Sequence, residues 1–386
     1  MLQLGNSFFF SMSSSFLTKL QHHHHHHHHF LSTSMMTVVA PQKRFYSKKL
    51  NPSPPLLPEI TFKTIQPEEH MSSSTSSSTF SSHQQHHHAI SSSSPPLVIL
   101  HGLFGSYLNF STFARHYSSK FRTRVYLVNL RNHSDPQNHS PEMTFTLMAS
   151  DLAQFLQKQE ISECDLFGFS LGGKTAMTAC LSDEFKQSVA QKVRKLVVGD
   201  ISPLPLRDSE WDIPHVVQAL LLLDEKLPEM KTRSEADAFL QTYIPNVEVR
   251  GFLLSNLKRN ENEPHIRKGV FDWKFNLKAI SSNLHEIADF PYKTQRVFNE
   301  MVELGQNYSI RNEPWTSFEK ETLFLKGGKS NLINTKSHRT METIQTFFPN
   351  YKLFEFENCG HWIHAEKYSL FVKVMEEFLV NDHSEK

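Results

Sequence analysis

Gly168-Phe169-Ser170-Leu171-Gly172 is the stretch that decides the fold of this 386-residue chain. It has the pattern G-x-S-x-G and stands between an apolar strand, residues 166–169, and a helical stretch, residues 172–181. In that setting the serine lies on a strained turn from strand to helix, and the two glycines leave room for the neighbouring strand and helix. The pattern predicts that Ser170 is a nucleophile. The alternative is a chance match in which Ser170 is only the N-cap of its helix.

Short apolar strands alternate with helical stretches on both sides of this motif. The expected strands are residues 97–100, 125–128, 166–169, 196–198, 322–325 and 352–356, and the expected helices are residues 110–117, 145–157, 172–181 and 367–379. Such an order is typical of a mostly parallel sheet with helices on both faces, so the fold class is α/β. Residues 60–65 alternate apolar and polar side chains, which predicts an antiparallel edge strand.

Residues 203–315 interrupt this order, because no strand pattern is evident there and helical stretches dominate. We expect helices at residues 216–223, at residues 234–243, opened by a cap of Ser234 and Asp237, and at residues 252–257. The segment is predicted to be a helical cap inserted after the sixth strand. Its apolar helix at residues 216–223 is expected to pack within the cap and to roof a pocket over Ser170 through its four leucines.

A serine hydroxyl is a weak nucleophile at neutral pH, so a general base must lie within hydrogen-bond reach. Asn358-Cys359-Gly360-His361-Trp362 follows the last predicted strand, where such a base is expected, and Gly360 gives the loop room to turn. His361 is therefore the candidate base. His364 lies three residues further on, and we interpret it as a surface or packing histidine.

The acid that orients the base is expected at the end of another strand. Its commonest position, the loop after the next-to-last strand, has no carboxylate before Glu342. One strand earlier, Asp200 follows residues 196–198, from which its short carboxylate can reach the base. Asp200 is the predicted acid, and the alternative is a turn carboxylate before the Ser202-Pro203 corner. The resulting order along the chain is serine, aspartate, histidine.

Negative charge that develops on a substrate carbonyl oxygen needs two preorganised N–H donors. The amide of Leu171, directly after Ser170, is expected to be one of them. The other is expected from the loop after residues 97–100, where His101-Gly102 precedes Leu103. The sequence predicts Leu103 as this second donor of the oxyanion hole and leaves Phe104 as the neighbouring alternative.

The core from residue 97 to residue 379 resembles the α/β-hydrolase domain-containing protein 11 family and its bacterial esterase relatives. The resemblance implies an α/β-hydrolase fold and a mitochondrial ester or thioester hydrolase that acts on acyl substrates, acylglycerols among them. In the bacterial relatives it implies an acid after the sixth strand, in agreement with Asp200. The chain departs from the family pattern at Asn129, Ser134 and Phe169, where the family tends to have Asp, Gly and His. The family-like runs are His101-Gly102-Leu103-Phe104-Gly105-Ser106, Arg131-Asn132-His133, Gly168-Phe169-Ser170-Leu171-Gly172-Gly173-Lys174-Thr175-Ala176-Met177, Asp200-Ile201-Ser202-Pro203 and Gly360-His361-Trp362-Ile363-His364-Ala365.

Together these residues describe a hydrolase that works through an acyl-enzyme. Ser170 attacks, His361 takes the proton and returns it to the leaving group, and water then repeats the cycle. This chemistry needs no cofactor, and the expected partner is a small-molecule acyl ester or thioester. A serine in the motif excludes the aspartate nucleophile of epoxide and haloalkane hydrolysis. The rival hypothesis is a catalytically silent protein of the same fold that binds partners through its cap.

Composition excludes several other classes of protein. Forty Lys and Arg residues against 39 Asp and Glu residues do not build the basic field that nucleic acids require. No apolar run approaches the roughly 18 residues that cross a bilayer, so we expect a soluble protein without a transmembrane segment. Three cysteines are too few for a disulfide framework, and the histidine-rich tracts at residues 22–29 and 84–88 lack a folded scaffold for a metal site.

The N-terminal segment has the composition of a targeting sequence. Its first acidic residue is Glu59, whereas five Lys or Arg residues precede it among many serines and phenylalanines. We predict a transit peptide at residues 1–46 and localisation in the mitochondrial matrix, in preference to a secreted or cytosolic protein. The predicted organisation continues with a Pro-rich entry segment at residues 47–58, a hydrolase domain at residues 59–381 with a low-complexity loop at residues 71–94 and the cap at residues 203–315, and a tail at residues 382–386.

Overall fold

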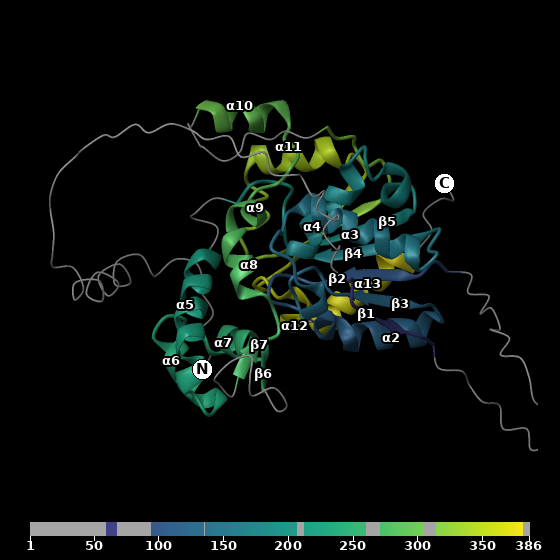
Figure 1. Ribbon diagram of the computed structural model, residues 1–386. Helices are drawn as coiled ribbons and strands as arrows, with labels where there is room; N and C mark the ends of the chain where they lie inside the picture. The colour runs from purple at the N-terminus through teal and green to yellow at the C-terminus, as the bar shows by residue number, and fades with distance from the viewer. Residues whose placement is uncertain are drawn as a thin grey trace, which may run out of the picture. The chain divides into compact units, whose positions relative to one another are not determined.

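The computed structural model describes residues 59–67, 94–134, 136–206, 212–259, 271–303 and 314–380. Its main sheet has seven strands: β1 (Phe62–Ile65), β2 (Leu97–Leu100), β3 (Val125–Val128), β4 (Cys164–Phe169), β5 (Val193–Gly199), β8 (Thr322–Gly327) and β9 (Tyr351–Phe356). Their order in the sheet is β1-β3-β2-β4-β5-β8-β9. Figure 1 labels β1 to β5 of this sheet. β1 is an antiparallel edge strand, and all other pairs are parallel. The mostly parallel sheet and its antiparallel edge strand are confirmed.

Helices cover both faces of this sheet, as predicted. α3 (Phe145–Lys158), α4 (Leu171–Leu181) and α11 (His338–Phe347) pack on one face, and α2 (Ser111–Phe121) and α13 (Tyr368–Val380) pack on the other. Side chains alternate along the strands to serve both sides. In β2, Val98 and Leu100 belong to the first core and Leu97 and Ile99 to the second. The sequence analysis did not predict α11, in which only Met341, Ile344 and Phe347 are apolar.

The chain leaves the sheet after β5 and returns at β8. The insertion follows β5, which is the fifth strand in the described part of the chain, where the sequence analysis expected the sixth. α5, α6 and α7 gather to one side of the sheet (Figure 1). The helices of the insertion are α5 (Ile213–Lys226), α6 (Arg233–Gln241), α7 (Val247–Leu254), α8 (Leu277–Ser282), α9 (Leu284–Ala288) and α10 (Gln295–Glu303).

Three details of the cap differ from the sequence prediction. The insertion contains a two-stranded hairpin, β6 (Leu257–Arg259) and β7 (Phe271–Trp273), whose strands are too short to show an alternating pattern. α6 is capped by Thr232, which accepts a hydrogen bond from the Glu235 amide, so the predicted cap of Ser234 and Asp237 is wrong. α7 runs from Val247 to Leu254, so it starts and ends earlier than predicted, and Asn246 caps its first turn.

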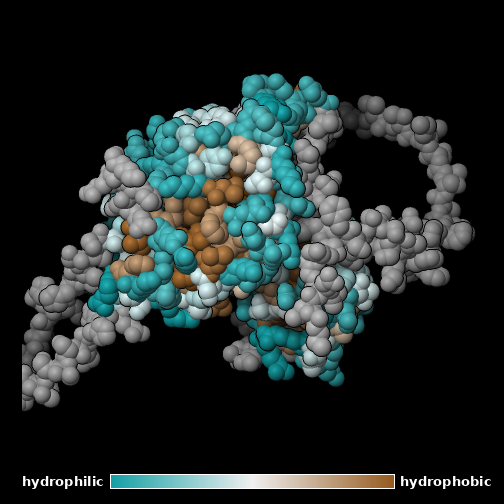
Figure 2. Space-filling view, turned by 180° about the vertical axis from the view of Figure 1, so that it is seen from behind, coloured by the Kyte–Doolittle hydropathy of each residue, from teal (hydrophilic) through white to brown (hydrophobic). Residues whose placement is uncertain are grey.

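The surface of the described chain has an apolar region. Figure 2 shows hydrophobic residues gathered on one face, bordered by hydrophilic ones. No helix in the described ranges is long and apolar enough to cross a bilayer. The predicted transit peptide, Pro-rich segment and tail, and the predicted low-complexity loop up to residue 93, lie outside the described residues. The remaining elements are η1 (Tyr107–Phe110), η2 (Pro136–Asn138), η3 (Lys186–Ala190), η5 (Leu227–Glu229) and α12 (Ile363–Glu366).

Candidate active site

Ser170 alone makes the turn between β4 and α4. Its backbone has φ 53° and ψ −115°, a conformation that is unfavourable for a residue with a side chain. A Cβ atom on Gly172 would lie 2.5 Å from a backbone oxygen of β2, and one on Gly168 would collide with the carbonyl of Gly172. Both glycines are therefore required sterically, as the sequence pattern predicts for a serine held on a strand-to-helix turn.

The predicted base and the predicted acid meet at the carboxyl end of the sheet. The His361 Nδ1 atom donates to Asp200 Oδ2 at 2.7 Å, and Asp200 is fully buried. The other carboxylate oxygen, Asp200 Oδ1, accepts a hydrogen bond from the Gly327 amide at 2.8 Å. This arrangement keeps the imidazole proton on Nδ1 and leaves Nε2 as the acceptor. The Ser170 hydroxyl has no hydrogen-bond partner among the described residues, and such contacts often form only in the substrate complex.

At the end of β8, near the commonest position of the acid, the site contains a backbone amide and no carboxylate side chain. Gly327 supplies the amide that binds Asp200, and a Cβ atom there would collide with the carbonyl of Gly360. Glycine at position 327 thus lets β8 approach the loop that carries His361. Glu342, the first carboxylate further along, instead pairs with Arg296 at 2.7 Å on the exposed surface.

Two buried histidines hold the loop that carries the predicted second oxyanion donor. The Phe104 amide donates to His133 Nε2 at 3.0 Å, and the Leu130 amide donates to His101 Nε2 at 3.1 Å. Each ring also donates from Nδ1 to a backbone carbonyl and is therefore neutral. Burial lowers the pKa of His101 to about 3 and the pKa of His133 to about 4. Because the Phe104 amide already has an acceptor, the geometry favours Leu103, whose amide has none in the described part of the chain.

The three departures from the family pattern fit their surroundings. Asn129 accepts a hydrogen bond from the Tyr107 amide at 2.8 Å and donates one to Thr61 Oγ1 at 2.9 Å, and a carboxylate could not donate the second. Ser134 has φ 68°, a left-handed conformation that explains why glycine is usual there. The Phe169 ring lies against two histidine rings at the site. These contacts describe how the chain accommodates Asn129, Ser134 and Phe169 at positions where it differs from the family. Asp200 and His361 still meet at the site.

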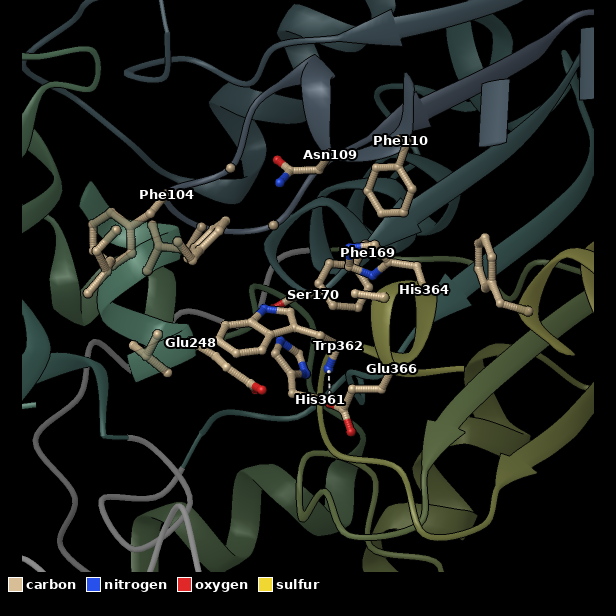
Figure 3. Close-up of a pocket in the computed structure, with 18 of the residues that line it drawn as sticks. Phe104, Asn109, Phe110, Phe169, Ser170, Glu248, His361, Trp362, His364 and Glu366 are labelled. Carbon is tan, nitrogen blue, oxygen red and sulfur yellow. Dashed lines mark hydrogen bonds between the residues drawn. The ribbon is translucent and has the colours of Figure 1, made fainter. Parts of the chain in front are cut away.

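Ser170 and His361 line one cavity with a volume of about 730 Å³ (Figure 3). That volume falls within the range of small-molecule sites. The oxyanion loop contributes Leu103 and Phe104 to the same cavity. The cap side chains that line it come from α5 and α7 and are Ile213, Val216, Glu248, Val249, Phe252 and Leu253.

The prediction that the leucines of residues 216–223 roof this cavity is wrong. None of the four leucines lines it, and Leu220 and Leu223 are fully buried in the hydrophobic core. Their spacing places them on the face of α5 that packs against other residues. The side chains of α5 that do line the cavity, Ile213 and Val216, lie nearer the start of the helix.

Glu366 supports the base in a way that the sequence analysis did not identify. Its carboxylate accepts hydrogen bonds from the amides of Gly360, at 2.7 Å, and Trp362, at 3.2 Å, on either side of His361. Figure 3 shows the bond from Trp362. Glu366 is the last residue of α12, and its carboxylate reaches back across this single turn to the amide of the N-cap residue Trp362, as in a capping box. The acidic residue five positions after His361 is the only sequence signal for it.

His364 lies in the site as well. It packs against Phe110 and Phe169 at ring centroid distances of 4.5 and 4.7 Å, and it also lines the cavity. These ring contacts agree with the interpretation of His364 as a packing histidine. Its place in the cavity wall was not predicted. Burial lowers its pKa to about 3, so the ring is neutral near pH 7.

The described residues do not indicate a metal site or a reactive thiol. No three His, Cys, Asp or Glu side chains within them are grouped so that they could hold a metal ion. All three cysteines are buried and unpaired. Burial raises the pKa of Cys359 to about 12, so this thiol beside the base is protonated.

The strained serine turn, the Asp–His pair and the cavity on this sheet define an α/β hydrolase. The family model described as alpha/beta hydrolase fold matches residues 95–368. Among solved structures, a marine microorganism esterase superimposes with a TM-score of 0.63 at 29% identity, covering 83% of this chain and 99% of that one.

Similar curated proteins identify the family of this chain within the α/β hydrolases. The sn-1-specific diacylglycerol lipase ABHD11 of Xenopus laevis is 34% identical over 285 residues, 73% of this chain and 79% of that protein. The protein of the same name from Mus musculus is 32% identical over 73% of this chain and 80% of that protein. The chain belongs to the α/β-hydrolase domain-containing protein 11 family. It is an ester hydrolase.

Proposed function

We propose that this protein hydrolyses an ester bond of a diacylglycerol through an acyl-enzyme formed on Ser170. The observation that carries the proposal is the 2.7 Å hydrogen bond between His361 and Asp200, beside a cavity that Ser170 also lines. The names of the frog and mouse relatives support a diacylglycerol substrate. Apolar side chains of the cap, such as Val216 and Phe252, offer the kind of wall that an acyl chain needs.

In the first half of the proposed reaction, Ser170 Oγ attacks the ester carbonyl carbon while its proton moves to His361 Nε2. The amides of Leu103 and Leu171 donate to the oxygen that becomes negative. The proton then passes from His361 to the leaving alcohol oxygen as the carbon–oxygen bond breaks. Asp200 stabilises the charged imidazole and does not itself take up the proton.

In the second half, water attacks the acyl-enzyme and gives a proton to His361. The tetrahedral intermediate collapses, the carboxylic acid leaves, and the proton returns to Ser170 Oγ. A thioester would follow the same route with a thiol as the leaving group. No step requires a cofactor.

A fluorophosphonate probe and a diacylglycerol with different acyl chains at sn-1 and sn-2 test the proposal together. We expect the probe to label Ser170, located by peptide mass spectrometry, and the wild-type protein to release the sn-1 fatty acid. Labelling without release of either acid would refute the diacylglycerol substrate. Absence of labelling would favour the rival hypothesis, a silent protein that binds partners through its cap.

We also propose that the protein acts in the mitochondrial matrix. The support is the basic, acid-poor composition of residues 1–58. A fusion of residues 1–58 to a fluorescent protein should enter mitochondria and be shortened near Ser47. Replacing Lys43, Arg44, Lys48 and Lys49 by glutamine should leave the fusion in the cytosol. Cytosolic fluorescence from the unmodified fusion would contradict the proposal.

A further inference from the structure

The walls of the cavity over Ser170 come from two sources. The cap supplies aliphatic and aromatic side chains, and the core supplies a second set from η1, α2, α12 and α13. The second set is rich in aromatic rings and includes Phe110, Phe113, Phe371 and His364. A neutral imidazole thus lies among several aromatic rings of this wall, which also contains Asn109 and Thr112.

His364 is surrounded by rings that cannot bond to it. Its ring centroid lies 4.5 Å from that of Phe110, 4.7 Å from that of Phe169 and 6.3 Å from that of Phe371. Its Nδ1 atom is buried and has no hydrogen-bond partner in the described part of the chain. A buried polar atom without a partner costs about 1 to 3 kcal/mol. A bound molecule that supplies the partner would recover that free energy.

The position of His364 indicates which part of a substrate it meets. His361 and His364 both pack against Phe169, at ring centroid distances of 4.8 and 4.7 Å (Figure 3). In the proposed reaction His361 must reach the oxygen of the leaving alcohol to give it a proton. The alcohol part of the ester therefore comes close to the wall that contains His364.

We propose that His364 is a specificity-determining residue that hydrogen-bonds a free hydroxyl group on the alcohol part of the ester. This inference rests on the proposed function and deepens it, because a diacylglycerol has one free hydroxyl and a triacylglycerol has none. A neutral imidazole has one donor and one acceptor, so it suits a hydroxyl, which also has both. An ester without the hydroxyl would leave His364 unpartnered and would be hydrolysed less efficiently.

The test compares a 2-hydroxyethyl ester with the 2-methoxyethyl ester of the same fatty acid, using the full-length protein. We expect the wild type to prefer the hydroxyl ester by about tenfold to a hundredfold in kcat/KM, the effect of one unpaired buried group. His364→Phe should bring the ratio close to one, and His364→Gln, which keeps a hydrogen-bonding group, should restore part of it. Tyr351→Phe removes a hydroxyl from β9, outside the cavity, and should not change the ratio.

The outcomes separate this inference from the proposed function. A wild-type ratio near one, with both esters cleaved, would overturn the role of His364 and leave ester hydrolysis intact. An unchanged preference in His364→Phe and His364→Gln, in protein that unfolds at the wild-type temperature, would overturn it too. Failure to cleave either ester, or diacylglycerol, would instead refute the proposed reaction and the inference with it. The Gln variant keeps the test decisive if His364→Phe does not fold.

Discussion

His361 and Asp200 lie 161 residues apart in the chain, yet His361 Nδ1 and Asp200 Oδ2 are 2.7 Å apart. Asp200 follows β5 with φ 46°, a left-handed conformation that is rare for a residue other than glycine. The Gly327 amide fixes its second oxygen. Strain at a buried, fully bonded carboxylate is typical of a functional position.

Asp200→Asn should lower kcat by about ten-thousandfold, because an amide in place of the carboxylate favours the wrong tautomer of His361. Steady-state kinetics on a short acyl ester would measure the loss. Glu342→Gln is the matched control, since Glu342 is the first carboxylate after β8 and pairs with Arg296 on the surface. It should leave kcat within about twofold of the wild type. A large loss in the control and a small one in Asp200→Asn would reverse the assignment of the acid.

Local sequence patterns were sufficient to predict those parts of the site whose positions depend on backbone sterics. The glycines around Ser170 and the position of Asp200 after an apolar strand could be read from a few neighbouring residues. Neighbouring residues could not show which amide, that of Leu103 or that of Phe104, is free to bind the oxyanion. The acceptor of the Phe104 amide is His133, which is 29 residues away in the sequence. The hairpin of β6 and β7 was missed for a related reason. Strands of three residues are specified by packing in the cap more than by their own pattern.

Ser170→Ala should abolish ester hydrolysis and fluorophosphonate labelling while leaving the fold intact. Alanine keeps the Cβ atom of Ser170 and lacks only the hydroxyl, and the turn keeps its glycines at positions 168 and 172. Circular dichroism would verify the fold, and hydrolysis of a short acyl ester would measure activity. Residual activity above about a thousandth of the wild-type rate would point to a second nucleophile.

Val216→Asn should raise KM for long acyl chains more than for short ones, because Val216 lines the cavity from the cap. Each buried methylene contributes about 0.8 kcal/mol, so the preference should move towards shorter chains. Leu222→Asn is the control on the same helix, since Leu222 does not line the cavity. An equal shift in both variants would mean that the cap as a whole, and not its cavity wall, sets chain preference.

The free energy of unfolding should fall as the pH drops from about 6.5 towards 4. Burial lowers the pKa of His101 to about 3 and that of His133 to about 4, so the unfolded chain binds protons that the folded protein does not. Stability is therefore complete above the unfolded pKa of about 6.5 and declines below it. His364 acts in the same direction, because burial lowers its pKa to about 3. Two buried carboxyls oppose these three histidines, since burial raises the pKa of Asp165 to about 6 and also raises the pKa of Asp151. Urea unfolding at several pH values would measure the decline.

His133→Asn should make that decline shallower, since one of the three imidazoles whose pKa is lowered by burial is gone. It should also lower kcat, because the Phe104 amide loses its acceptor and the loop that carries Leu103 loosens. His139→Asn is a suitable comparison, as His139 lies nearby without contacting that loop amide. A pH dependence identical to that of the wild type in His133→Asn would exclude His133 as a contributor.

Glu366→Ala should lower kcat by about tenfold to a hundredfold with little change in KM, because the amides of Gly360 and Trp362 lose the carboxylate that fixes them on either side of His361. Glu366→Gln retains one acceptor oxygen and should recover part of the rate. Glu357→Ala is the matched control, as Glu357 is an exposed acid on the same loop. It should leave kcat unchanged. If Glu366→Ala alters only the unfolding temperature, the carboxylate stabilises the loop without positioning the base.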